Sequence, residues 1–336
     1  MEIKSLTSFR AIIAIVIFLF HCKIHLGYTL DINYLDRFLL NGATFMTGFF
    51  VLSGFILAHV YRDENFASRV NIFNFYIKRF ARVYPVYALS TITYLLIYHL
   101  EPLQLFRTAI IDIFLIQSFF KSMFLLANNG GTWSVSVEMF LYFLFPFFVI
   151  LSNRSSKILY FAFPIGLIGS LSLIFEKSDY IYANPIFRIS DFLFGIGFYF
   201  LVFHFKKISQ YNFFHFLTIS LIICVTIFLG GSEFSYMQGN FLLAPLFALW
   251  ISLIFYSNSI LYSSKFMEFF GRISYSFYLW QFISIGFGKF LVNHNLGFNL
   301  NVIILVIFIL NIAIATISYI LVEEKLRKYI SGRFSG

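Results

Sequence analysis

An arginine and a histidine interrupt the first apolar stretch of the sequence, residues 8–26. Arg10 and His21 are eleven residues apart, which places both side chains on one face of a helix, separated along its axis by about 16 Å. An ionisable side chain in a lipid-embedded helix is costly unless it faces protein or water, so such residues mark functional sites. The spacing therefore predicts a polar stripe along which a ligand passes.

His21 has three interpretations. A histidine near a helix end often bonds a neighbouring backbone group and does nothing more. Its four-residue offset from His25 suggests metal binding, but zinc sites usually need three protein ligands, and no third ligand lies in this stretch. The remaining role is a general base that takes a proton from a reacting group. We favour the base and expect no metal site.

A carboxylate, Glu138, lies inside a second apolar stretch, residues 133–151. Counted inward from the outer end of each helix, Glu138 and His21 are both about five residues, or roughly 8 Å, deep. We therefore expect the two side chains to meet at one level, with Ser134 four residues away on the face of Glu138. Glu138 could instead pair with an outer arginine such as Arg188, but we prefer a carboxylate that orients His21.

Arg79 and Arg82 belong to the basic run of residues 78–82, at the inner entry to another apolar stretch. Three residues apart, they share one helical face. Such a cluster often only fixes the orientation of a helix in the membrane. The alternative is a phosphate clamp, because guanidinium groups bind phosphate through two parallel hydrogen bonds. A phosphate-rich cytoplasmic ligand such as coenzyme A would fit that clamp.

Two further groups have simpler explanations. Residues 48–55, GFFVLSGF, contain small side chains, including Ser53, that let helices or a thin ligand approach closely, with helix packing the commoner reason. Arg188 and Asp191 are three residues apart and are expected to neutralise each other.

The amino-acid composition indicates that these helices lie in a membrane. Sixty per cent of the 336 residues are apolar and only 12% are charged, which is not the composition of a soluble protein. Spans of roughly 20 residues leave room for a single all-α membrane domain over residues 1–336, without a separate soluble domain. The predicted spans are residues 8–26, 44–61, 83–100, 133–151, 157–175, 185–203, 213–230, 240–257, 273–292 and 300–322.

One further apolar run, residues 103–120, contains Arg107, Asp112 and Gln117 and is predicted to be a re-entrant or interfacial helix. Ten crossings with both termini in the cytoplasm place most of the 24 lysines and arginines on the inner side of the cell membrane, as the positive-inside rule requires. An eleventh crossing would move the later basic residues outside. This distribution explains the net charge of +9 without nucleic-acid binding.

Together these residues resemble the acyltransferase-3 family of multi-spanning membrane acyltransferases. The similar segments, in the family's order, are Arg10 with His21, residues 48–55, Arg79 with Arg82 ahead of Tyr84 and Pro85, residues 132–138 (TWSVSVE), residues 271–280 (GRISYSFYLW) and residues 319–327 (YILVEEKLR). The chain departs from the family at Gln281, where a histidine is common, and at Lys325, where a proline is common.

The resemblance implies transfer of an acyl group, most often acetyl from acetyl-CoA, to a hydroxyl of a cell-envelope or exported glycan or glycolipid. Acetyl-CoA would be a substrate, with no permanently bound cofactor. We expect His21 and Glu138 to be catalytic, and we expect the donor to bind at Arg10, Arg79 and Arg82. Supporting positions are expected at Ser53, Trp133, Ser134 and Ser136. The competing function is a transporter or flippase of lipid-linked sugar without acyl chemistry, because polar residues would line its path equally well.

Overall fold

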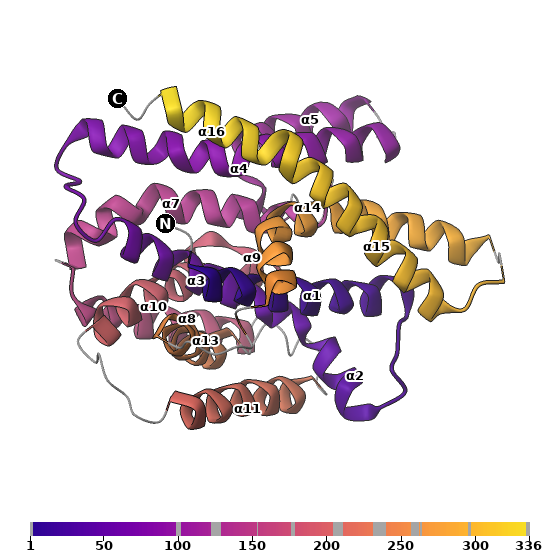
Figure 1. The fold of residues 1–336 in the computed structure, drawn as a ribbon, viewed down its shortest axis with the longest axis horizontal. Coiled ribbons are helices and arrows are strands. Elements are labelled where there is room, and N and C mark those ends of the chain that lie inside the picture. Colours follow the sequence, from indigo (N-terminus) through magenta and orange to yellow (C-terminus); the bar gives the residue numbers. More distant parts are fainter. Residues whose placement is uncertain are drawn as a thin grey trace.

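The computed structural model describes residues 3–98, 102–121, 129–152, 154–175, 179–203, 211–230, 240–256, 262, 264–294 and 297–333. This part of the chain is built from helices, without a β-strand (Figure 1), which confirms the predicted all-α class. The α-helices are α1 (Lys4–Leu26), α2 (Asn33–Leu40), α3 (Phe45–Val60), α4 (Arg69–Tyr98), α5 (Pro102–Phe114), α7 (Thr132–Ser152), α8 (Leu159–Phe175), α9 (Asp179–Ala183), α10 (Pro185–Phe203), α11 (Tyr211–Leu229), α13 (Asn240–Tyr256), α14 (Lys265–Asn293), α15 (Leu300–Ser318) and α16 (Glu324–Arg333).

Each of the ten predicted spans lies on a helix in the described part of the chain. Helices α4 and α14 begin well before the predicted starts at residues 83 and 273, so Arg79 and Arg82 lie within α4 rather than at its entry. Seven of these helices, α1, α3, α4, α7, α10, α11 and the α15–α16 rod, are long and apolar enough to cross a membrane. Helices α8 and α13 are apolar but shorter. Helix α14 is long and carries Lys265, Glu268, Arg272 and Lys289. The chain is therefore a multi-pass membrane protein.

The predicted re-entrant or interfacial run folds as α5 and a 3₁₀ turn, η2 (Gln117–Phe119). Thirteen residues make α5 about 20 Å long, shorter than the roughly 30 Å hydrocarbon core. The Gln117 side-chain amide donates to the Thr132 carbonyl oxygen at 2.9 Å, and the Ser118 hydroxyl donates to the Trp133 carbonyl oxygen at 2.6 Å. The run therefore ends against the start of α7, inside the protein.

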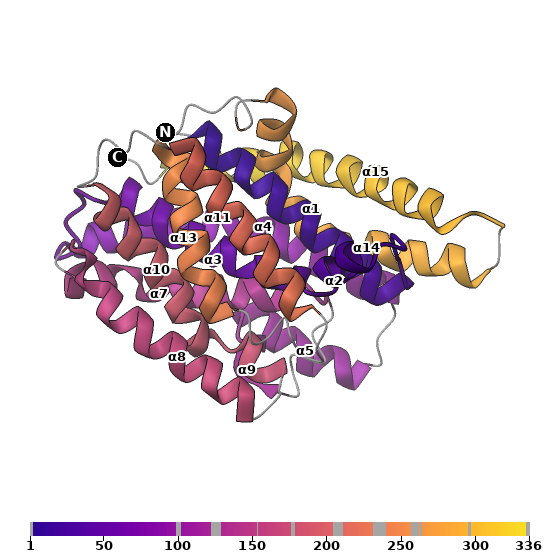
Figure 2. The same cartoon turned by 90° about the horizontal axis from the view of Figure 1, so that it is seen from below.

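Helices α1 and α3 lie in the middle of the bundle (Figure 1). Helix α3 packs so closely on α10 that a Cβ atom at Gly54 would collide with the Phe192 carbonyl oxygen, and one at Gly195 with the Val51 carbonyl oxygen. Small residues permit this approach, so Gly54 in residues 48–55 serves packing. Helix α13 packs between α11 and the pair α3 and α10, and α11 lies at the surface (Figure 2).

Helices α14, α15 and α16 form the other side of the bundle. Helix α14 packs along α1, where a Cβ atom at Gly271 would collide with the Thr7 carbonyl oxygen. Helix α15 continues through a π-helical turn, η5 (Tyr319–Glu323), into α16, which packs on α4. Such turns re-aim side chains and are frequent at functional sites. Here Glu323 is only 3% exposed and accepts a 2.9 Å hydrogen bond from Ser276.

Candidate functional site

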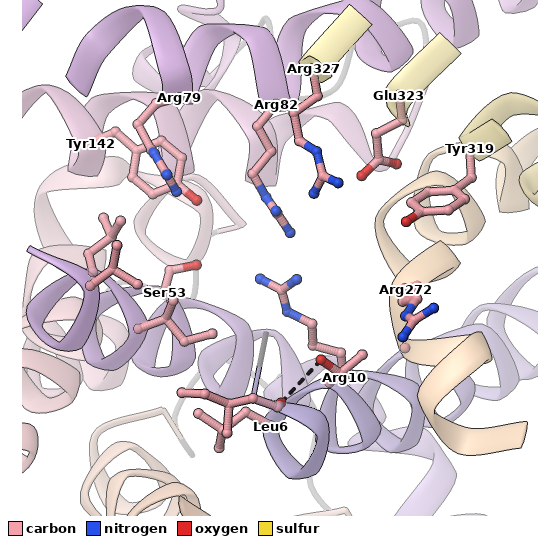
Figure 3. Close-up of a pocket in the computed structure, with 16 residues that line it drawn as sticks. Leu6, Arg10, Ser53, Arg79, Arg82, Tyr142, Arg272, Tyr319, Glu323 and Arg327 are labelled. Carbon is pink, nitrogen blue, oxygen red and sulfur yellow. Dashed lines mark hydrogen bonds between the residues drawn. The ribbon is translucent and has the colours of Figure 1, made fainter. Parts of the chain in front are cut away.

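A cavity of about 360 Å³ opens between α1, α3, α4, α7, α14 and the end of the α15–α16 rod (Figure 3). Five arginines from four parts of the chain line it: Arg10, Arg79, Arg82, Arg272 and Arg327. Among the described residues that line the cavity, Glu323 is the single carboxylate. The guanidinium groups of Arg10, Arg82 and Arg327 point into the same space (Figure 3). The cavity is therefore strongly positive.

The arginines differ in how their charges are balanced. Arg272 donates to the Glu268 carboxylate at 2.5 Å. In the described part of the chain, no carboxylate lies within 4.0 Å of the Arg10 or Arg82 guanidinium. The Nε atoms of Arg10 and Arg79 are buried and lack a hydrogen-bond partner. Unpaired, desolvated cations are costly, so the cavity favours an anion with several charges, and phosphate suits guanidinium groups best.

Aromatic rings hold Arg79 in place. Its guanidinium donates to the Tyr61 hydroxyl at 3.3 Å and lies 5.6 Å from the centre of that ring. The rings of Phe75 and Tyr142 lie at 5.8 and 5.9 Å. Such cation–π contacts orient a guanidinium without neutralising it, which leaves its charge available to a ligand in the cavity.

A second, narrower cavity of about 50 Å³ shares Arg10, Ser53 and Arg82 with the first. It extends from Arg10 and Arg82 along α3, α7 and α14 and is lined mainly by apolar and aromatic side chains. Its other lining residues are Met46, Phe49, Phe50, Val83, Ser134, Val135, Glu138, Ser274, Tyr275 and Tyr278. The two cavities thus meet at Arg10, Ser53 and Arg82. The first is wider and lined by five arginines, and the second is narrower and lined mainly by uncharged side chains.

Glu138 lies at the junction of the two cavities. One oxygen of its carboxylate accepts a 3.1 Å hydrogen bond from Ser53 and a short hydrogen bond from Tyr142. Ser53 lines both cavities, Tyr142 the first and Glu138 the second. In the described structure no hydrogen bond joins Glu138 to His21. The carboxylate therefore contacts residues of the two cavities, Ser53 and Tyr142, and is not hydrogen-bonded to the histidine.

We expected the Glu138 and His21 side chains to meet at one level. In the structure Glu138 is hydrogen-bonded to Ser53 and Tyr142 instead. The residues just before α7 contact the Phe282 ring, since a Cβ atom would lie 2.8 Å from it at Gly130 and 3.3 Å from it at Gly131. Phe282 is a ring neighbour of His21. Glu138 lies seven residues after Gly131, about 10 Å further along the helix. Depth counted from an outer surface misleads here because α7 begins inside the protein, with Asn129 and Thr132 fully buried.

His21 is half-buried among aromatic rings. Its ring centre lies 4.6 Å from that of Phe282, 4.9 Å from Phe20 and 5.7 Å from the stacked ring of His25. Its Nδ1 atom is buried and has no hydrogen-bond partner. His21 lines neither cavity. The polar stripe predicted from Arg10 to His21 is thus not one continuous cavity. Arg10 lines both cavities, whereas His21 lies outside them among aromatic rings.

The supporting residues divide into two groups. Ser53 and Ser134 line the second cavity. Trp133 and Ser136 do not, and they hold other parts of the protein: Trp133 packs against Phe50 and Tyr182, and the Ser136 hydroxyl accepts a 3.5 Å hydrogen bond from the Ser118 amide. These two positions anchor the start of α7 and the turn η2.

Arg188 and Asp191 form a buried ion pair, as predicted. An Arg188 guanidinium nitrogen lies 3.0 Å from the Asp191 carboxylate, and both side chains are 2% exposed. The same guanidinium donates to the Tyr182 carbonyl oxygen and the Thr47 hydroxyl, and stacks on the Tyr182 ring at 4.2 Å. The pair stabilises the packing of α3, α9 and α10 and lies outside both cavities.

Several lining residues were not singled out from the sequence: Tyr142, Arg272, Tyr278, Tyr319, Glu323 and Arg327. Tyr142 is four residues after Glu138 and shares its helical face, so spacing alone indicates that contact. The others belong to residues 271–280 and 319–327, which carried the resemblance but no assigned chemistry.

Comparison with known proteins gives one match. The family model described as an acyltransferase domain, acyltransferase-3, matches residues 3–320. None of the curated proteins and none of the solved structures matches the chain.

Proposed function

The chain belongs to this family of membrane acyltransferases, and on that premise we propose that it transfers an acyl group, most simply acetyl, from acyl-CoA to a hydroxyl of a cell-envelope or exported glycan or glycolipid. The observation that carries the proposal is the arginine-lined cavity, because its charge suits the phosphates of a nucleotide donor. A volume of about 360 Å³ lies in the range of small-molecule sites.

Acyl-CoA has a charged part, its phosphates, and an uncharged part, the pantetheine arm, and each suits one of the two cavities. Arg10, Arg79 and Arg82 bind the phosphates, and Arg327, which lies beside Arg82 (Figure 3), and Arg272 add further positive charge. The uncharged pantetheine arm enters the narrow second cavity. Glu138 stands where that cavity begins, and its negative charge disfavours phosphate there, so the phosphates stay among the arginines while the neutral arm passes.

His21 is the proposed general base. It accepts the proton of the acceptor hydroxyl while the oxygen attacks the thioester carbonyl carbon. The new carbon–oxygen ester bond forms, the carbon–sulfur bond breaks, and the departing thiolate takes the proton from the imidazolium, which leaves CoA thiol and neutral His21. The alternative order passes the acyl group through His21 before it reaches the hydroxyl.

The donor and acceptor approach from opposite sides in this proposal. Both termini face the cytoplasm, the arginine cavity opens to acyl-CoA on that side, and His21 lies toward the outer side of the cell membrane. The positive-inside distribution of charge supports this orientation. Nucleic acid has no part in it.

Mass spectrometry of surface glycans from cells with and without the gene tests the function. We expect a glycan heavier by one acyl group only in cells that express the protein, and cells that express His21→Ala at the same level should lack it. Identical glycans in all three would contradict the proposal, and movement of unmodified lipid-linked sugar by purified protein would favour a transporter.

A further inference from the structure

The path from the arginines ends before it reaches His21. Along α14 the lining residues run from Arg272 in the first cavity to Tyr275 and Tyr278 in the second, and Phe282, the ring neighbour of His21, follows one turn later. Helix α7 gives the same order in reverse, since Glu138 and then Ser134 line the second cavity. Tyr278 and Ser134 therefore lie at its outer end.

These two residues close that end. The Ser134 hydroxyl oxygen lies 3.1 Å from the Tyr278 hydroxyl and 2.9 Å from the Gly131 carbonyl oxygen. The Tyr278 ring packs on the α7 start, where a Cβ atom at Gly131 would lie 3.2 Å from it. Tyr278 is 6% exposed. Ring, hydroxyl and backbone thus pack together into a wall at this end of the cavity.

We propose that Tyr278, held by Ser134, limits the length of the acyl group that this protein accepts. The inference rests on the proposed function, since it needs acyl-CoA in the two cavities. With the phosphates bound by arginines and a pantetheine arm of fixed length, the acyl group at the far end of the arm meets the Tyr278 wall. The second cavity, which also takes the pantetheine arm, measures only about 50 Å³, so it leaves room for no more than a short acyl group.

A longer chain would have to displace the Tyr278 ring and break its hydrogen bond to Ser134. Close-packed interiors resist added methylene groups, and a pocket discriminates between ligands that differ by one methylene by about tenfold or more. The wall therefore selects against long acyl groups by steric exclusion. Phe282, the ring neighbour of His21, follows Tyr278 one turn later on α14, so the acyl group that stops at the Tyr278 ring lies on the side of the protein where the base is.

Competition binding to the purified protein in nanodiscs tests this, with acetyl-, butyryl- and hexanoyl-CoA as ligands. We expect the wild-type protein to bind acetyl-CoA at least about tenfold tighter than hexanoyl-CoA, and Tyr278→Ala to bring that ratio near one. Tyr278→Phe keeps the ring but loses the hydrogen bond to Ser134, so its ratio should lie between those of the wild type and Tyr278→Ala. Tyr319→Ala, which removes a tyrosine from the arginine cavity, should weaken all three ligands equally.

An unchanged ratio in Tyr278→Ala, or a wild-type protein that does not discriminate by length, would overturn the inference while leaving the donor site intact. If Tyr278→Ala does not yield folded protein, Tyr278→Leu shortens the side chain less severely. This variant should shift the binding ratio toward butyryl-CoA, and no shift would contradict the inference. A wild-type protein that binds none of the three ligands overturns the proposed function and this inference with it.

Discussion

The Ser53 hydroxyl donates a 3.1 Å hydrogen bond to the Glu138 carboxylate and thereby joins α3 to α7 at the junction of the two cavities. Tyr142 donates to the same oxygen. Glu138 is therefore part of the channel wall, opposite Arg10 and Arg82, which line the same cavity. Its carboxylate adds a negative charge beside these arginines and makes no hydrogen bond to His21 in the described structure.

A double-mutant cycle measures the Ser53–Glu138 contact. Hydrogen bonds to charged groups are worth about 1.5–3 kcal/mol, so Ser53→Ala and Glu138→Ala should be non-additive by at least about 1 kcal/mol in the free energy of acyl-CoA binding. Ser53→Ala combined with Ser136→Ala is the matched control and should be additive, because Ser136 lies outside both cavities. Additive effects of Ser53→Ala and Glu138→Ala would show that the contact does not serve the donor site.

His21→Ala should separate binding from chemistry. Loss of a general base lowers turnover by about 10²–10⁴-fold, whereas the affinity for acyl-CoA should stay the same because His21 lines neither cavity. The release of CoA thiol in the presence of acceptor is the readout. His25→Ala, which removes the stacked neighbour, should retain most of the turnover. Full activity in His21→Ala would exclude the histidine as the base.

The Arg188–Asp191 pair predicts a stability effect without a catalytic one. Arg188→Met leaves Asp191 buried without its cation, which typically costs about 3–5 kcal/mol of unfolding free energy. Arg188→Met with Asp191→Leu removes both charges and should recover most of that loss. Thermal unfolding in detergent measures both variants. Equal stability of the single variant and the wild type would mean that the pair does not stabilise the packing of α3, α9 and α10.

Much of this arrangement follows from local spacing. The period of the apolar stretches predicts the helices, and the three-residue spacing of Arg188 and Asp191 predicts their pairing. Arg10, Arg79 and Arg82 were expected together at the donor, and the structure brings them into one cavity. The Arg188–Asp191 pairing and the shared face of Arg79 and Arg82 each lie within one helix, whereas Arg10 is on α1 and was expected beside them from the family resemblance.

The errors come from where helices begin and how they turn. The depth of Glu138 could not be counted from its helix end because α7 starts at a buried segment held by Gln117 and Ser118. Glu323 and Arg327 reach the cavity through the π-helical turn η5 and the packing of α16 on α4. These are long-range packing features that residue spacing does not encode.

Acid should release the contact between α1 and α2. A hydrogen bond from Lys23, 2.8 Å long, holds the pKa of the Asp36 carboxyl below its usual value. A lowered native pKa stabilises the fold above the unfolded-state pKa, and this stabilisation is lost as the pH falls through the native pKa. Asp36→Asn should therefore lower the melting temperature slightly at neutral pH and not at strongly acidic pH.

Asp63→Asn is the control for this pH dependence, because the Asp63 side chain is 85% exposed and exposed pairs contribute little. A melting-temperature difference between the wild type and Asp36→Asn that persists unchanged into acid would contradict the assignment of this contact to the Asp36 charge.

The binding of acetyl-CoA to Arg82→Ala protein tests the donor site most directly. Arg82 lines both cavities and has no carboxylate within 4.0 Å in the described structure, and hydrogen bonds to charged groups are worth enough that its loss should weaken binding by about tenfold or more. Lys78→Ala, in the same basic run but outside the cavities, should bind acetyl-CoA as the wild type does. Unchanged affinity in Arg82→Ala, or equal losses in both variants, would contradict the assignment of the arginine cavity to the acyl donor.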